Sequence, residues 1–220
     1  IRAQAVWAAG ILIGYWAAMT LIPVPGHGAG ILTPEGSLAS WLDRCCLPGQ
    51  LRHELYDNEG MLSTLPAVAT TLLGVFSGHW LRSPVSPSRK VAGLSLAGIS
   101  ALALGLLWNM AFPINKLLWT SSFVFFAGGW SMLLLALFYW LIDMRGYRRW
   151  AFPFVVIGLN AITIYFLQFF FDFGLIVTVF THEFQNFLGE FKSTFLLVSA
   201  IAVKWLFLYA LYRKKIFLKA

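Results

Sequence analysis

The stretch FPINKLLWTSSFVFF, residues 112–126, places a short polar turn between two long apolar runs. The run before the turn covers residues 91–112 and the run after it covers residues 118–142, and neither contains Asp, Glu, Lys or Arg. Each run is longer than the roughly 20 residues that a helix needs to cross about 30 Å of hydrocarbon. This stretch therefore predicts a hairpin of two transmembrane helices, with Asn115 and Lys116 at its turn.

The composition extends this prediction to the whole chain, which is 59% hydrophobic and only 11% charged over its 220 residues. A soluble domain carries about 25% charged residues, so this chain has too much apolar surface to bury in one aqueous core. Continuous apolar runs also exclude the alternating pattern of barrel strands. We expect an all-α membrane protein, a polytopic bundle forming a single transmembrane domain over residues 1–220. About six transmembrane helices are predicted, at residues 3–22, 61–81, 91–112, 118–142, 151–171 and 194–212.

The basic residues predict the direction of these spans. Most of the 16 Lys and Arg residues fall in the connections at residues 82–90 and 143–150 and near the two termini. By the positive-inside rule this side is cytoplasmic, so both termini face the cytoplasm and the long segment 23–60 forms an outer loop. Lys116 lies on the outer side, against this bias. It either extends to the lipid head groups or belongs to a site.

Motifs of the common soluble activities are absent from the sequence. Residues 25–30, PGHGAG, lack the Gly-Lys-Ser/Thr ending of a phosphate-binding loop. The four histidines have no metal-ligand spacing, so we expect no metal site. Cys45 and Cys46 are adjacent and make no disulfide framework. No stacking platform or groove-reading element for nucleic acid is present, and the net charge of +7 instead reflects the orientation of the spans.

Three polar features lie within or at the edge of the predicted spans. Lys204 falls in the last span, where a charge is costly, so it either serves a function or meets a buried partner or a water-filled cleft. Asn160, in the fifth span, suits either interhelical hydrogen bonding or ligand binding. Lys116, Trp119 and Ser122 recur at a spacing that would place them on one helix face. With Asn115 they offer hydrogen bonds and a ring face, the mixture that binds a sugar.

Four stretches, taken in order, resemble one known family. They are DNEGMLSTLPAVATTLLGVFSGHWL (57–81), FPINKLLWTSSFVF (112–125), FPFVVIGLNAITIYF (152–166) and LYRKKIF (211–217). Together they are similar to the C-terminal half of the heparan-α-glucosaminide N-acetyltransferase family, and the similarity spans essentially the whole chain. Bacterial members of this family are often described as N-acetylglucosamine-related transporters. The resemblance implies part of a larger protein in a bacterial inner membrane.

The resemblance also implies a polytopic acyltransferase that takes acetyl-CoA from the cytoplasmic side and acetylates a glucosamine-type amino sugar on the other side. The acetyl-handling histidine of the family belongs to its N-terminal half, before this chain begins. No catalytic residue is therefore assigned here, and the chain alone is expected to be inactive. The residues that match family motifs are expected to line the amino-sugar cavity: Asn115, Lys116, Trp119, Ser122, Glu59 and Asn160.

Basic residues on the cytoplasmic side are the candidates for holding the phosphates of acetyl-CoA. This cofactor-binding group comprises Arg148, Arg149, Arg213 and Lys214, and Lys204 is added on the membrane argument alone. Lipid head groups are the alternative partners of these cations.

Two other functions stay open on the sequence alone. An amino-sugar transporter would have broken helices near the membrane midplane, and the sequence favours a break at residues 171–184. A non-catalytic membrane scaffold would leave the outer motifs without a role. The sequence also leaves open which acyl group and sugar are used, and whether the protein forms a homodimer.

Overall fold

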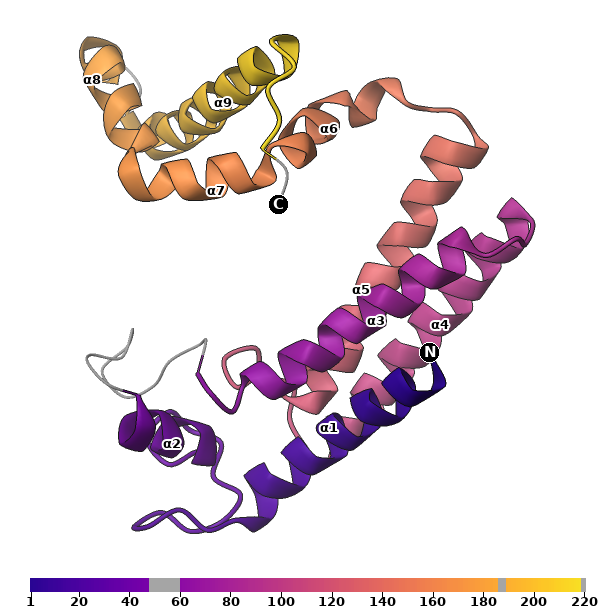
Figure 1. The fold of residues 1–220 in the computed structure, drawn as a ribbon. Helices are drawn as coiled ribbons and strands as arrows, with labels where there is room; N and C mark the ends of the chain where they lie inside the picture. The colour runs from indigo at the N-terminus through magenta and orange to yellow at the C-terminus, as the bar shows by residue number, and fades with distance from the viewer. Residues whose placement is uncertain (48–59, 186–188, 219–220) are drawn as a thin grey trace. The chain divides into compact units, whose positions relative to one another are not determined.

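The computed structural model describes residues 1–47, 60–185 and 189–218, which form helices and no β-strand (Figure 1). The all-α prediction is confirmed for these described residues. By its internal contacts the chain divides into two compact units, Ile1–Met144 and Arg145–Ala220. That residues 1–220 form a single transmembrane domain stays a prediction.

The first unit contains four long helices that lie side by side and one short helix near their ends (Figure 1). These helices are α1 (Arg2–Leu21), α2 (Leu38–Cys46), α3 (Thr64–Arg82), α4 (Pro87–Trp108) and α5 (Ser121–Phe138), and α5 continues as a π-helix, η1 (Tyr139–Met144). Helix α4 begins at Pro87, a position where proline's missing N–H removes no hydrogen bond of the helix.

The second unit consists of shorter helices followed by one long helix. The short helices α6 and α8 both pack against the long helix α9. In chain order the elements are η2 (Arg149–Ala151), α6 (Phe152–Leu159), α7 (Ala161–Phe170), α8 (Phe173–Gln185), η3 (Gly189–Phe191) and α9 (Lys192–Arg213).

Four helical segments in the described part of the chain are long and apolar enough to cross a membrane: α1, α4, α5 together with η1, and α9. The pair α6 and α7 makes a fifth if it is counted as one bent span. These five coincide with five of the six predicted spans. The sixth prediction, residues 61–81, corresponds to α3, which does not belong to this group. Apolar helices of this length are those of an integral membrane protein.

The predicted span 151–171 is bent rather than straight. Its two halves, α6 and α7, meet at Asn160 at an angle of 58°. Asn160 has φ −132° and ψ 32°, outside the helical region. A further interruption separates α7 from α8 at residues 171–172, which is the beginning of the interval where the sequence favoured a break. The sharper bend at Asn160 was not predicted from the sequence.

Glycines allow α4 and α5 to approach until their backbones touch. A Cβ placed on Gly98 would lie 2.9 Å from the carbonyl oxygen of Gly129, and a Cβ on Gly129 would lie 2.7 Å from the carbonyl oxygen of Gly98. Gly105 repeats the arrangement farther along, because its Cβ would lie 2.8 Å from the backbone nitrogen of Phe126. Small residues at such contacts drive helix association in lipid, where apolar side chains gain little by leaving the bilayer.

The short helix α2 packs over the ends of α1 and α4. Buried Tyr15 and Met19 of α1 share an apolar cluster with Leu38 of α2 and with Phe112 and Leu118 of the α4–α5 connection. This cluster fixes α2 and the α4–α5 connection at the same end of the bundle.

The carboxylate of Asp43 ties α2 to the segment before α3. Its Oδ1 accepts a hydrogen bond of 2.9 Å from the backbone N–H of Met61. Gly60 passes so close that a Cβ there would collide with this carboxylate. A buried charge needs such hydrogen bonds, so Asp43 fixes where the chain enters α3.

Replacing Gly129 with Ala should destabilise the first unit. The new methyl group would press on the backbone of α4, and overpacking of this kind costs about 1–3 kcal/mol. Thermal unfolding of the purified protein in detergent measures the effect. Gly14→Ala is the matched control, because Gly14 is also in a helix and a Cβ placed there would meet no neighbouring atom within 4 Å. Equal unfolding temperatures for the two variants would contradict the close contact.

Candidate functional site

The α4–α5 connection, which contains the predicted sugar-site residues, is held by its own polar side chains. Oδ1 of Asn115 accepts hydrogen bonds from the backbone N–H groups of Leu117, at 2.8 Å, and Leu118, at 3.3 Å. The N–H of Asn115 donates to Oγ1 of Thr120 at 3.0 Å. Thr120 is fully buried and also caps α5 by accepting from the N–H of Phe123. The amide of Asn115 therefore stabilises this turn.

Trp119 faces the interior of the first unit. Its indole N–H donates to Oγ1 of Thr70 on α3 at 3.1 Å, and its ring meets Phe123 edge-on at 5.3 Å between centroids. Trp119 has φ 52°, in the left-handed region that non-glycine residues rarely adopt. Ser122 is fully buried, with its hydroxyl 3.1 Å from that of Thr120.

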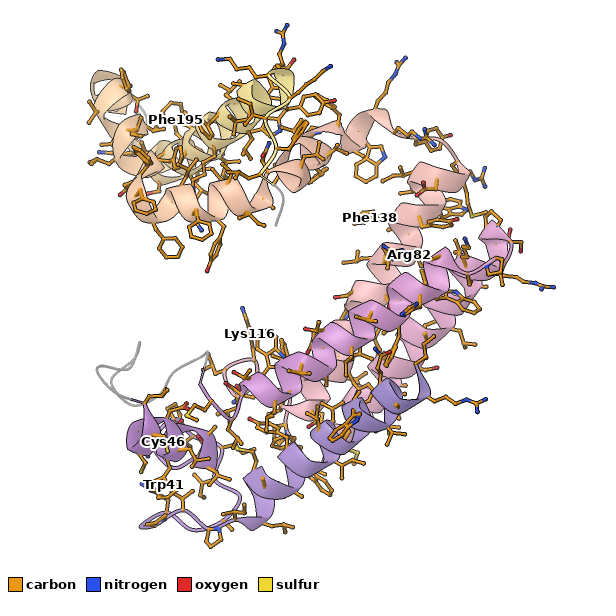
Figure 2. The ribbon with its side chains drawn as sticks, in the orientation of Figure 1. Trp41, Cys46, Arg82, Lys116, Phe138 and Phe195 are labelled. Atoms are coloured by element: carbon orange, nitrogen blue, oxygen red, sulfur yellow. The ribbon has the colours of Figure 1, made fainter. Side chains whose placement is uncertain are left out.

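The expectation that Lys116, Trp119 and Ser122 share one helix face is wrong. Helix α5 begins only at Ser121, and the left-handed backbone of Trp119 separates the turn from the helix. Lys116 is exposed and extends from the end of the bundle near α2, as Figure 2 shows. Lys116 is thus the accessible member of the predicted group, with Asn115 half-buried beside it. Glu59 lies outside the described residues.

Asn160 binds the C-terminal segment. It is 1% exposed, and its Nδ2 donates to the carbonyl oxygen of Ile216 at 3.1 Å. Its Oδ1 accepts from the N–H of Leu218 at 3.3 Å and from the hydroxyl of Thr163 at 3.4 Å. The residues that follow α9 are thereby hydrogen-bonded to the bend between α6 and α7. Two of the stretches that carry the family resemblance, 152–166 and 211–217, meet through this amide.

Four of the five predicted cofactor-binding cations gather at one end of the second unit. The ring of Phe152, in the first turn of α6, lies 5.6 Å from that of Tyr212 near the end of α9. Trp205 strengthens the same packing by donating from its indole N–H to the carbonyl oxygen of Pro153 at 3.2 Å. Within one helical turn of the Phe152–Tyr212 contact lie four exposed cations: Arg148, Arg149, Arg213 and Lys214.

An aromatic row runs along α9 toward these cations. The rings of Trp205 and Tyr209 are stacked, with 5.1 Å between centroids and 9° between planes. Tyr209 and Tyr212 continue the row at 6.5 Å and 18°. Exposed cations beside a row of half-buried aromatic side chains form a surface suited to a phosphate-bearing molecule.

Lys204 does not join this group. It lies nine residues before Arg213 on α9, which is about 14 Å along a helix axis. Its Nζ is 5.5 Å from the centroid of Phe173 on α8, within the distance of a cation–π interaction. Lys204, the charged residue within the last predicted span, therefore has an aromatic ring as its partner, at the contact between α8 and α9.

Sequence reasoning overlooked Asp43 and Thr120, although both organise the end of the first unit that carries α2 and the α4–α5 connection. Asp43 is 1% exposed and Thr120 is fully buried, and each accepts hydrogen bonds from backbone N–H groups. The available signal for Asp43 was its position as the one acid in the stretch SLASWLDRCCL, residues 37–47. Thr120 immediately precedes two serines and a long apolar run, which is a typical helix N-cap position.

Comparison with known proteins identifies distant relatives. No protein-family model matches the chain. Heparan-alpha-glucosaminide N-acetyltransferase of Homo sapiens is 28% identical over an alignment of 243 residues that covers 95% of this chain. The enzyme of the same name from Mus musculus is 27% identical over 240 residues and 93% of the chain. The chain is a distant relative of these acetyltransferases. It spans only 36% and 35% of their respective lengths.

Removing the amide of Asn115 should lower stability, because two backbone N–H groups of the turn lose their acceptor. We expect Asn115→Ala to cost about 1–2 kcal/mol, measured by thermal unfolding in detergent. Lys116→Ala is the control, since the exposed neighbour should change stability by less than about 0.5 kcal/mol. If Asn115→Ala unfolds at the wild-type temperature, its amide does not hold the turn.

Removing the amide of Asn160 should release the C-terminal segment. Asn160→Ala loses the hydrogen bonds to Ile216 and Leu218. Each bond contributes about 1 kcal/mol, so the population of the detached segment should rise roughly tenfold or more. Limited trypsin digestion, with cleavage after Lys214 and Lys215 followed by mass spectrometry, measures this opening. Thr163→Ala should digest at nearly the wild-type rate, because the two bonds to the segment remain. An unchanged rate for Asn160→Ala would refute the anchoring role.

Proposed function

We propose that this chain is the C-terminal part of a membrane acetyltransferase that moves an acetyl group from acetyl-CoA to a glucosamine-type amino sugar across a bacterial inner membrane. The observation that carries the proposal is the similarity to two acetyltransferases over more than nine-tenths of the chain. A match of this extent includes loops and helices alike, so it is more than a shared abundance of apolar residues. Both termini of the chain are proposed to face the cytoplasm.

The donor side of the proposed reaction is the basic and aromatic end of the second unit. Exposed Arg148, Arg149, Arg213 and Lys214 can meet the phosphates of acetyl-CoA through charge-assisted hydrogen bonds. The aromatic row ending at Tyr212 lies beside these cations and is proposed to pack alongside the adenine base.

The acceptor side of the proposed reaction is the α4–α5 connection. Lys116 is exposed there and can donate hydrogen bonds to sugar hydroxyls, with Asn115 and Glu59 as further candidates. Trp119 and Ser122 would support this site from inside the unit, because their polar atoms are already bonded to Thr70 and Thr120.

The chemical step exchanges a thioester for an amide. The amine nitrogen of the sugar attacks the acetyl carbonyl, the C–S bond breaks, and the thiol of CoA leaves as the amine loses a proton. The acetyl-handling histidine is proposed to lie in a part of the protein outside this chain, so the chain alone supplies binding surfaces. Along the chain, the 24-residue span formed by α5 and η1 begins after Lys116 and ends before Arg148.

An amino-sugar transporter is the second candidate function. The 58° bend at Asn160 favours it, since discontinuous helices form many transporter sites. The bend nevertheless offers few free groups to a ligand, because the Asn160 amide is bonded to the C-terminal segment. Acetyl transfer therefore remains the leading proposal.

The decisive experiment uses the full-length parent protein in sealed proteoliposomes. Labelled acetyl-CoA is supplied on the face of the basic connections and glucosamine on the opposite face, and labelled N-acetylglucosamine is sought on the sugar side. Product there is the expected result. Uptake of labelled N-acetylglucosamine without acetyl transfer would replace the proposal with transport.

In the same assay, Lys116→Ala should raise the KM for glucosamine about tenfold or more, because a hydrogen bond from a charged group contributes about 1.5–3 kcal/mol. The KM for acetyl-CoA should stay unchanged. Lys192→Ala, which removes an exposed lysine at the start of α9, is the control. Wild-type kinetics for Lys116→Ala would assign this lysine to the lipid head groups instead.

A further inference from the structure

A cavity of about 440 Å³ lies between α3, α4 and α5. Its volume falls within the range of small-molecule sites in proteins. Its walls are apolar, apart from the hydroxyls of Ser77 and Ser100. The hydroxyl of Ser77 already donates to the carbonyl oxygen of Leu73 at 2.9 Å. A sugar would leave most of its hydroxyls without partners in such a cavity, at considerable cost, whereas a hydrocarbon chain would not.

The cavity has the length of one membrane leaflet. Along α4 its lining extends from Gly93 to Leu104, an interval of eleven residues and about 16 Å at the helical rise of 1.5 Å. The hydrocarbon core of a bilayer is about 30 Å thick, so the cavity matches half of it. One end of the cavity, lined by Trp80 and Gly93, faces the connection between α3 and α4, and the other end is lined by Leu104 and Phe125.

Trp80 lines the cavity at the end toward the α3–α4 connection and joins the two helices. Its ring packs on Gly93, where a Cβ would lie 2.5 Å from the ring. Its indole N–H donates to the carbonyl oxygen of Lys90 at 3.1 Å. The end of α3 and the start of α4 are thus fixed to each other directly beside the mouth of the cavity.

Three cations lie within about one helical turn of Trp80 or Gly93, at this mouth. Arg82 is the last residue of α3, and Arg89 and Lys90 are in the first turn of α4, one turn before Gly93. Arg82 and Arg89 are exposed, and within the described residues none of the three forms an ion pair. Asp143 of η1 is an acid at the same end of the bundle, and it leaves an excess of positive charge. Cations at the ends of membrane helices can meet lipid phosphates, which lie just outside the hydrocarbon.

From the apolar cavity and its cationic mouth together, we propose that this site binds an anionic phospholipid. One acyl chain fills the space between α3, α4 and α5, and the lipid phosphate is held by Arg82, Arg89 and Lys90. This inference is separate from acetyl transfer, since the site shares no residue with the proposed donor or acceptor sites. A neutral lipid would leave the cations unused, and a free phosphate would leave the cavity unfilled.

The test measures which lipid stays bound to the full-length protein. Purified protein is mixed with micelles containing equal amounts of phosphatidylglycerol and phosphatidylcholine with identical acyl chains, and bound lipid is quantified by native mass spectrometry. We expect phosphatidylglycerol to be retained about tenfold or more over phosphatidylcholine. Glycerol phosphate, which has the charge without the chains, should not bind.

Two kinds of variant divide the site into its parts. Arg89→Gln with Lys90→Gln should reduce phosphatidylglycerol retention about tenfold or more, since each basic group near an anionic membrane contributes roughly a fivefold factor. Arg2→Gln, at the start of α1, removes an exposed cation from a helix that does not line the cavity and should change nothing. Ala97→Phe should fill the cavity and displace both lipids while leaving the cations in place.

Several outcomes would overturn the inference. Equal retention of the two lipids would show that the cations do not select the lipid. If Arg2→Gln lowered phosphatidylglycerol retention as much as Arg89→Gln with Lys90→Gln does, the preference would come from the overall charge of the protein and not from this site. Unchanged retention in Ala97→Phe, with normal thermal unfolding, would place the lipid elsewhere. Cross-linking of Ala97→Cys to another helix of the same protein would show that a helix occupies the cavity. None of these readouts depends on acetyl transfer, so the two proposals fail independently.

Discussion

The close contact of α4 and α5 is the constraint on which the rest of the first unit depends. Apolar side chains gain little by leaving lipid for protein, so helices associate in a membrane through close packing, and here Gly98, Gly105 and Gly129 allow backbone to meet backbone. Fixing these two helices also fixes both ends of the connection between them. Helix α3 then packs over the pair without filling the space beside it, which leaves the cavity lined by all three helices.

The polar side chains at the helix ends and the helix bend form hydrogen bonds with backbone groups, and the bonded atoms are therefore not free to bind a ligand. Asn115, Thr120 and Asp43 each accept from amide N–H groups at helix ends, and Asn160 does so at a helix bend. Free backbone groups at helix ends and bends must find partners where water is scarce. Residues shared with a family can therefore be shared because they hold the fold. This consideration leaves exposed Lys116 as the sharpest acceptor-site candidate.

The sequence predicted the long helices because length and absence of charge are sufficient to identify a span. The sequence could not predict the bend at Asn160, because the carbonyl of Ile216, which accepts a hydrogen bond from the Asn160 side chain, lies 56 residues farther along the chain. The helix face proposed for Lys116 and Trp119 failed for a local reason, because a left-handed tryptophan is not foreseen from residue type. The gathering of four cations near Tyr212 likewise depends on the packing of α6 against α9.

The separation of the two proposed sites along the chain suits transfer across a membrane. Between the turn that carries Lys116 and the segment that carries Arg148 runs a 24-residue span, about 36 Å long at the helical rise. The phosphates of a coenzyme cannot enter hydrocarbon without a large cost, and sugar hydroxyls pay a similar penalty when they lack partners. The acetyl group is small and uncharged. It is therefore the one reacting part that can pass between the two sides, and each charged or polar partner can stay bound at its own end.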